Sequence, residues 1–289
     1  MKAPDFDYCK PRSLDEVFAL LAEYGDEARL LAGGQTLMAT LNMRLSEPAL
    51  LIDITGIDTL RGISVQNGAL RIGALVTHSQ IESSALVADH APLLTMAAPH
   101  IAHRAIRNLG TFGGSIAYAD PAAEWPTCVL ALDATIIVRG ATGERSIAAA
   151  DFFLDLYTTA LEPGELVTAC EIPARAAGAR FHFDELARRH GDYAIAGLAA
   201  VSQFNDEVLG HTSLAFMGIA ATPVRARRTE AFLDGRAALP AVIDEAAALL
   251  AEELDGALSP VADLTNSSAT KRHLATVLLR RALRALAAG

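Results

Sequence analysis

Two glycine-rich segments carry residue types that suit the binding of a phosphate group. They are Ala32-Gly33-Gly34-Gln35-Thr36 and Thr111-Phe112-Gly113-Gly114-Ser115, and both combine paired glycines with hydroxyl side chains. Glycine pairs allow positive φ angles and close approach of the backbone to a ligand. Free N–H groups where a helix begins also attract an anion. Each segment alone is compatible with an ordinary tight turn, whereas two such turns could hold one diphosphate from both sides.

The best-known phosphate motifs are missing from these segments. Neither contains G-x-G-x-x-G, so neither is a Rossmann fingerprint. Neither is followed by Gly-Lys-Ser or Gly-Lys-Thr, which excludes a P-loop. The sequence therefore indicates a different kind of nucleotide site.

Two further residues have both a structural and a functional interpretation. Asp120 precedes Pro121, a pattern typical of a helix N-cap, and its carboxylate could also accept hydrogen bonds from ligand hydroxyls. Tyr193 follows His190-Gly191-Asp192, which suits a polar hairpin turn. The same tyrosine could stack on a flat ring, a contact that contributes about 0.5–1.5 kcal/mol.

The sequence favours neither a metal centre nor a nucleophilic catalytic site. His100 and His103 would share one face of a helix, but no acidic residue or cysteine stands nearby as a third ligand. Cys9, Cys128 and Cys170 are scattered, so they cannot bind an iron–sulfur cluster without a partner. Gly-x-Ser-x-Gly is absent, and we assign no catalytic residue.

The first turn lies between a predicted strand at 28–32 and a predicted helix at 37–44, followed by a strand at 50–54. Helices are predicted over 77–87, 93–108 and 121–132, and strands over 70–72, 135–139 and 166–172. A loop over 173–179 is a plausible domain boundary. Three strands then form an antiparallel meander over 181–187, 195–204 and 213–219, and helices follow over 240–254 and 271–286.

Composition narrows the class of protein. The formal charge of −10, without clustered Lys or Arg, argues against nucleic-acid binding. The N-terminal residues have no apolar signal region, and the apolar runs are too short for a membrane span. Together with the few scattered cysteines, this predicts a soluble cytoplasmic protein.

Taken together, these segments resemble the FAD-binding medium subunits of molybdenum hydroxylases, a family that includes the flavin domain of xanthine dehydrogenase. The resemblance covers nearly the whole chain. Its most specific stretch is Ile106 to Ser115, followed by Ala119 to Glu124. The other matching segments are 4–8, 11–16, 31–37, 72–78, 188–196 and 271–274. Phe112, Tyr118 and Leu109 depart from the residues that are commoner in the family.

The resemblance implies an α+β fold. A two-lobed FAD-binding domain of the vanillyl-alcohol oxidase (PCMH) type would span 1–175, with a lobe boundary near 56. A C-terminal domain of the carbon monoxide dehydrogenase flavoprotein type would span 176–289, with a three-stranded antiparallel sheet and helices. The residues implied to bind FAD are Ala32, Gly33, Gly34, Gln35, Thr36, Leu37, Ile101, Thr111, Gly113, Gly114, Ser115, Asp120, Leu166 and Tyr193.

The implied function is electron transfer within a molybdenum-containing oxidoreductase that is incomplete without its partners. A small subunit would carry [2Fe–2S] clusters, a large subunit would hold the molybdenum cofactor, and the assembly would be a dimer of heterotrimers. FAD would pass electrons to an external acceptor while the large subunit hydroxylates an aromatic, N-heterocyclic or other small substrate. The alternative is a self-contained flavin-dependent oxidase of the vanillyl-alcohol type.

Overall fold

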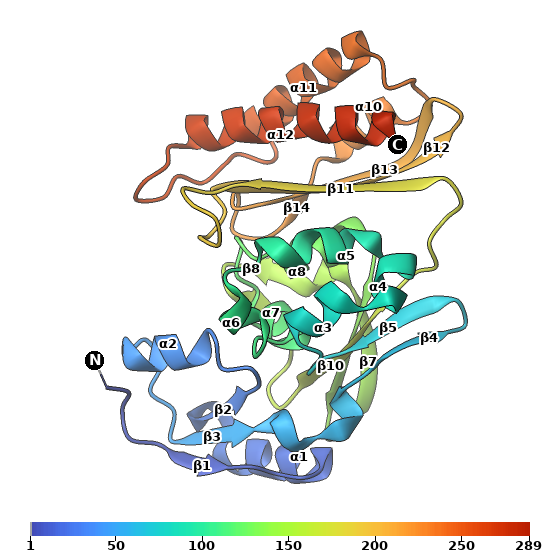
Figure 1. Ribbon diagram of the computed structural model, residues 1–289. Helices are drawn as coiled ribbons and strands as arrows, with labels where there is room; N and C mark the ends of the chain where they lie inside the picture. Colours follow the sequence, from blue (N-terminus) through green and yellow to red (C-terminus); the bar gives the residue numbers. More distant parts are fainter. Residues whose placement is uncertain (1) are drawn as a thin grey trace.

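A computed structural model describes residues 2–289. The N-terminal lobe is a small parallel sheet with the strand order β1-β3-β2, and it lies at the bottom of Figure 1. Its elements are β1 (Asp7–Cys9), α1 (Leu14–Tyr24), β2 (Ala28–Leu31), α2 (Leu37–Asn42) and β3 (Leu50–Asp53). Val17 and Phe18 of α1 pack on Leu50 and Ile52 of the central strand. This packing fixes the point at which β2 ends and the first glycine turn begins.

The second lobe is built on a five-stranded antiparallel sheet with the order β4-β5-β10-β6-β7. Its strands are β4 (Ile63–Gln66), β5 (Ala69–Gly73), β6 (Thr135–Gly140), β7 (Gly143–Ala148) and β10 (Leu166–Ile172). Short helices pack on this sheet (Figure 1). They are α3 (His78–Ser83), α4 (Ala85–His90), α5 (Pro92–Ala97), α6 (Arg104–Arg107), α7 (Phe112–Tyr118) and α8 (Glu124–Ala131). The short helix α9 (Ala149–Phe152) follows β7, and β8 (Phe153–Asp155) and β9 (Thr158–Thr159) then form a small antiparallel hairpin.

The long helices predicted over 77–87 and 93–108 are wrong, because each is broken. Ser84 ends α3 and caps α4 through its hydroxyl. A 3-10 turn, Ala98–His100, follows α5, and Ala102 then takes a positive φ of 42°. A residue in that left-handed region cannot continue an α-helix. The predicted helix over 121–132 likewise begins only at Glu124, after a turn.

The C-terminal domain contains four antiparallel strands rather than the three expected. Their order is β11-β12-β13-β14, with β11 (Ala179–Leu186), β12 (Ala196–Asn205), β13 (Val208–Met217) and β14 (Val224–Arg225). The additional strand has only two residues, too few for an alternating pattern, and the ion pair between Arg225 and Glu230 holds it in place. The helices α10 (Arg227–Leu233), α11 (Pro240–Asp255) and α12 (Ser268–Ala288) follow.

Both faces of this four-stranded sheet are buried. Phe183, Ala199 and Met217 join the core of the second lobe, whereas Leu198 and Phe216 pack with α11 and α12 on the opposite face. Figure 1 shows the sheet between the helices of the second lobe below and α11 and α12 above. The C-terminal domain is thus bound to the second lobe through a continuous apolar core.

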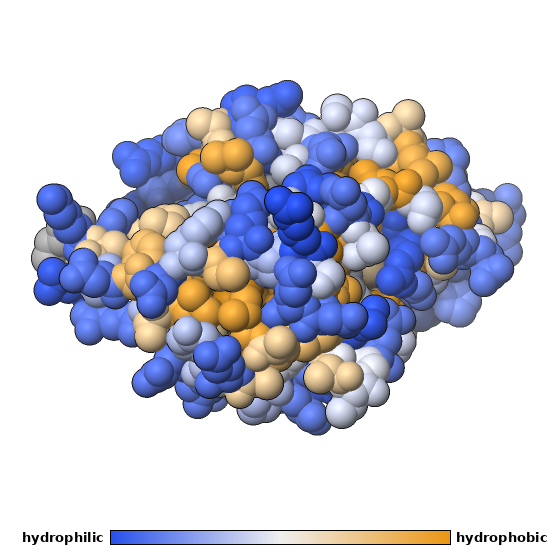
Figure 2. Space-filling model, turned by 90° about the horizontal axis from the view of Figure 1, so that it is seen from below, coloured by the Kyte–Doolittle hydropathy of each residue, from blue (hydrophilic) through white to orange (hydrophobic). Residues whose placement is uncertain are grey.

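No helix within residues 2–289 combines the length and apolar character needed to cross a bilayer. Figure 2 shows apolar residues interspersed with hydrophilic ones over the face seen from below.

Candidate flavin site

The first glycine turn offers a row of free backbone donors. It joins β2 to α2, and Gly34 takes a φ of 70°, which favours glycine. Within residues 2–289, the N–H groups from Gly33 to Leu37 have no acceptor in the protein. The Gln35 amide braces the turn by donating to the Gly33 carbonyl at 2.9 Å. Successive free N–H groups before a helix favour the binding of an anion.

The second turn differs, since its N–H groups are already used. Phe112 N donates to Val76 O at 2.8 Å, and Gly113 N donates to Ala74 O at 2.9 Å. Gly114 N donates to the Thr111 hydroxyl oxygen, which caps α7. The second turn therefore offers hydroxyl groups and glycine backbone that a ligand can approach closely. The free N–H groups belong to the first turn.

The structure brings the two turns into contact. A Cβ added at Gly33 would lie 2.1 Å from Leu109 O and 2.8 Å from Gly110 Cα. A Cβ added at Gly114 would lie 3.8 Å from the Ala32 Cβ. The turns are separated by more than 70 residues in the sequence. Their contact provides the geometry for one ligand held by both.

A buried histidine holds the second turn against the lobe. His78 N donates to Gly110 O at 3.0 Å, and the imidazole packs where a Gly110 side chain would lie. Trp125 Nε1 donates to His78 Nδ1 at 2.8 Å, so the ring proton resides on Nε2. Burial, with the charge of Arg107, lowers the pKa of His78 to about 4. His78 is therefore neutral, and its ring packs against Gly110 and supports the second turn.

Asp120 lies among three tyrosines just beyond α7. Its carboxylate accepts from Ala122 N at 2.9 Å, which caps the turn before α8 and leaves the other oxygen free. The rings of Tyr118 and Tyr157 are 5.2 Å apart. Burial, followed by the charge of Asp120, raises the pKa of Tyr157 to about 12 and also raises the pKa of Tyr193. Sequence reasoning missed Tyr157, which lies in the β8–β9 hairpin.

Close backbone contacts connect Tyr193 to the remaining segments. Gly191 takes a φ of 76° and packs against Ala102 O and the His103 ring, directly after Ile101. The Tyr193 side chain is 68% exposed. An exposed ring at this position is suited to stacking on a planar ligand.

Leu166 belongs to a different core cluster from Ile101, and Ala32 of the first turn packs against the cluster of Leu166. Leu166 is 2% exposed on β10, and it packs with Val17 and Leu75 in the core of the N-terminal lobe. Ile101, by contrast, belongs to the core of the second lobe. The structure therefore does not bring Leu166 into the exposed wall that Tyr193 forms.

The prediction that His100 and His103 share a helix face is wrong. His100 ends a 3-10 turn, and the positive φ of Ala102 separates it from His103, which precedes α6. Residues 2–289 contain no group of three or more His, Cys, Asp or Glu side chains that could hold a metal ion.

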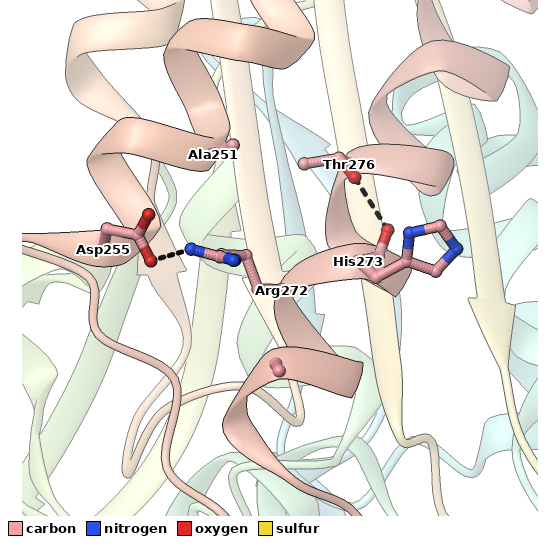
Figure 3. Close-up of a pocket in the computed structure, with 6 residues that line it drawn as sticks. Ala251, Asp255, Arg272, His273 and Thr276 are labelled. Atoms are coloured by element: carbon pink, nitrogen blue, oxygen red, sulfur yellow. Dashed lines mark hydrogen bonds and ion pairs between the residues drawn. The ribbon is translucent and has the colours of Figure 1, made fainter.

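A surface pocket with a volume of about 310 Å³ lies elsewhere, between α11 and α12. Figure 3 shows the ion pair of Asp255 and Arg272 across one side of it and the Thr276 hydroxyl donating to the His273 carbonyl. Its charged groups are already paired, and it contains no row of free N–H groups. It therefore does not provide a cofactor site.

Comparisons with known proteins identify the family of the chain. A family model described as "FAD binding domain in molybdopterin dehydrogenase" matches residues 4–175, and "CO dehydrogenase flavoprotein C-terminal domain" matches 181–286. The carbon monoxide dehydrogenase medium chain of Hydrogenophaga pseudoflava is 35% identical over 99% of this chain and 98% of its own length. The nicotine 6-hydroxylase medium subunit of Paenarthrobacter nicotinovorans is also 35% identical, over 98% of each chain.

Solved structures give the same result. Quinoline 2-oxidoreductase from Pseudomonas putida 86 superposes with a TM-score of 0.94 at 36% identity, over 100% of this chain and 99% of that chain. Carbon monoxide dehydrogenase from Hydrogenophaga pseudoflava superposes with a TM-score of 0.95, at the same identity and coverage. The residues present fit the flavin cofactor: free N–H groups and a side-chain-free cradle suit the diphosphate, and an exposed aromatic ring suits the flavin. The chain therefore belongs to the FAD-binding subunits of molybdenum-containing dehydrogenases.

Proposed function

We propose that this chain binds one FAD between its two glycine turns. The N–H groups of Gly33 to Leu37 would hold the diphosphate, with Ala32 at the contact between the turns and hydroxyls from Thr36, Thr111 and Ser115 around it. The observation that carries this proposal is the row of free N–H groups, placed against a second turn that has no side chain at Gly114. Each charge-assisted bond to a phosphate oxygen contributes about 1.5–3 kcal/mol.

The remaining contacts would orient the rest of the cofactor. Asp120 keeps one carboxylate oxygen free to accept from ribityl hydroxyls. Tyr193 would stack on the isoalloxazine, with Ile101 behind the loop that Gly191 contacts. Leu166, which the family resemblance also implies, would support the first turn from the core, because Ala32 packs against the same cluster. The FAD-binding domain would end at residue 175 and the C-terminal domain would begin at 176, with a lobe boundary near 56.

We further propose that the chain passes electrons rather than transforming an organic substrate itself. FAD can take up two electrons and release them to a second acceptor, and the protein contributes binding and orientation. Residues 2–289 contain no group of three or more His, Cys, Asp or Glu side chains that could hold a cluster. Cys128 and Cys170 are buried, and burial raises the pKa of Cys170 above its usual range. The electrons would therefore come from [2Fe–2S] clusters on a small partner subunit.

The relatives support such an assembly. Several are named as medium chains or subunits of carbon monoxide dehydrogenase, nicotine 6-hydroxylase or glyceraldehyde dehydrogenase. Similar FAD subunits thus serve chemically different substrates. A large molybdenum subunit would choose the substrate here, with an aromatic or N-heterocyclic compound as our proposal, and the complex would be a dimer of heterotrimers.

The test is to purify this chain from its native host with a tag and to identify what accompanies it. We expect stoichiometric FAD, a cluster-bearing subunit and a molybdenum subunit, with flavin reduction by substrate only in the complete complex. If the isolated flavin-loaded chain oxidised an organic substrate unaided, the electron-transfer role would be wrong and a self-contained oxidase would replace it.

A further inference from the structure

A buried arginine holds the loop between α5 and α6. The Arg107 side chain is 11% exposed, and its Nη1 donates to Ile101 O at 3.0 Å. The same nitrogen lies 3.3 Å from Ala102 O and 3.4 Å from Pro99 O. Hydrogen bonds from a charged donor are stronger than those between neutral groups. One guanidinium group therefore fixes the course of the segment 99–102.

Glu82 of α3 fixes this guanidinium group in turn. Arg107 Nε donates to Glu82 Oε2 at 3.0 Å, and Arg107 Nη2 lies 3.5 Å from Glu82 Oε1. Arg104 Nη1 also lies 3.2 Å from Glu82 Oε2, but the Arg104 side chain is 64% exposed. The two arginines thus share one carboxylate, while the hydrogen bonds to the loop come from Arg107. Arg104 is therefore a matched control for Arg107.

The loop that Arg107 holds contains strained backbone. Ala102 takes a φ of 42°, in the left-handed region that disfavours a residue with a Cβ. Such a conformation persists where the surrounding contacts hold it, and residues of this kind cluster at functional sites. The carbonyl groups of Ile101 and Ala102 stand on the two sides of the strained residue. Arg107 therefore acts at the point where the loop would otherwise relax.

The strained residue also contacts the turn that carries Tyr193. A Cβ added at Gly191 would lie 2.9 Å from Ala102 O and 2.9 Å from the His103 ring, so the two backbone segments are in close contact. Tyr193 follows Gly191 by two residues. A change in the course of the loop at Ala102 would therefore move the Gly191 turn, and with it the exposed ring of Tyr193.

We propose that Arg107 is a positioning residue for the flavin ring. By holding the carbonyl groups of Ile101 and Ala102, it fixes the surface on which the Gly191 turn rests, and therefore the place of Tyr193. This inference rests on the proposed function, because the stacking of Tyr193 on the isoalloxazine is part of that function. The diphosphate site at Gly33 to Leu37 makes no use of these contacts, so the loss of Arg107 affects the binding of the ring.

The coupling between Arg107 and Tyr193 is the direct test. Tyr193→Ala should raise the dissociation constant of FAD about 2- to 13-fold in the unmodified chain. Arg107→Lys keeps the charge and loses the planar fork of donors, so it should raise the constant by a similar factor. When Arg107→Lys is already present, Tyr193→Ala should add less than about twofold, because both changes remove one interaction. Independent, multiplicative losses would overturn the proposal, and so would an unchanged dissociation constant in Arg107→Lys.

Flavin fluorescence is a second readout, which a merely structural role would not move. A tyrosine stacked on the isoalloxazine quenches its emission, so bound FAD should emit more strongly in Arg107→Lys, as in Tyr193→Ala. Arg104→Lys should leave the emission as it is in the unmodified chain. Glu82→Gln, which keeps both arginines, should raise the emission by a smaller factor and replaces Arg107→Lys if that variant does not fold. Unchanged emission in the variant that is measured would contradict the positioning role.

Hydrogen exchange of the FAD-free chain separates this proposal from the proposed function. Ile101 N donates to Ala98 O at 3.2 Å, and Asp192 N donates to Arg189 O at 3.2 Å. Both amides should exchange faster in Arg107→Lys than in Arg104→Lys, while the amides of β12 keep their rates. Unchanged exchange at both amides, or a uniform rise throughout the chain, would overturn the proposal. If the unmodified chain bound no FAD, the proposed function would fail, and these rates would still decide whether Arg107 holds the two segments.

Discussion

Replacing Gly33 by alanine tests the contact between the two turns. The new Cβ would lie 2.1 Å from Leu109 O and 2.8 Å from the Leu109 carbonyl carbon. To reach an ordinary contact of 3.4 Å from that oxygen, the two backbone segments must separate by about 1.3 Å. Backbone atoms cannot rotate away as a flexible side chain can, so the turns themselves must move.

The expected consequence is a large loss of FAD affinity. A separation of this size exceeds the tolerance of a hydrogen bond, so at least one charge-assisted bond to the diphosphate is lost. At about 1.5–3 kcal/mol per bond, the dissociation constant should rise by roughly 10- to 150-fold. Overpacking should also lower the free energy of unfolding by about 1–3 kcal/mol.

The assay is a fluorescence titration of the FAD-free chain with FAD, together with thermal unfolding of the same samples. Gly210→Ala is the matched control, because a Cβ at Gly210 meets no atom within 4 Å. The control should bind FAD as the unmodified chain does. A dissociation constant for Gly33→Ala within threefold of the unmodified value would refute the proposal that contact between the turns shapes the site.

Two further predictions concern single side chains. Tyr193→Ala should weaken FAD binding by about 0.5–1.5 kcal/mol, whereas Tyr193→Phe should retain it, as measured by the same titration; equal losses in both variants would argue against stacking. The Asp53 carboxylate accepts hydrogen bonds from Thr55 N and from the hydroxyls of Thr55 and Tyr8. Burial of this carboxylate opposes its ionisation, but these hydrogen bonds and Lys10 outweigh that effect and lower the pKa of Asp53 to about 2. Its stabilising contribution is therefore complete above the unfolded pKa near 4 and is lost as the pH falls toward 2. Denaturant titrations at pH 7 and pH 3 should show a smaller acid loss in Asp53→Asn, and an unchanged difference would contradict this.

Much of the fold was readable from periodicity and glycine placement. The β2–α2–β3 unit around the first turn and the three long strands of the C-terminal domain are close to their predicted ranges. The helix over 93–108 could not be predicted to break, because the break depends on a positive φ at Ala102, a residue type that ordinarily favours helix. The strand β14 depends on an ion pair formed only after folding.

The sequence predicted which residues form the site, but not which of their backbone groups are free to bind a ligand. The two turns have similar sequences, so the sequence does not show which of their N–H groups are free. In the structure the N–H groups of Phe112 and Gly113 donate to carbonyl groups just after β5, whereas those of Gly33 to Leu37 remain free. The same holds for Tyr157, which reaches the site from a distant segment. Such contacts join residues that are far apart in the sequence, and local sequence patterns do not predict them.

The most direct measurement of the central claim is a two-dimensional amide NMR titration of the deuterated chain with FAD. The account predicts the largest shifts and the strongest new protection from hydrogen exchange for the amides of Gly33 to Leu37. It predicts little change for Phe112 N and Gly113 N, which already donate to Val76 O and Ala74 O. Unchanged amides from Gly33 to Leu37 in the presence of bound FAD would contradict the assignment of the diphosphate to this turn.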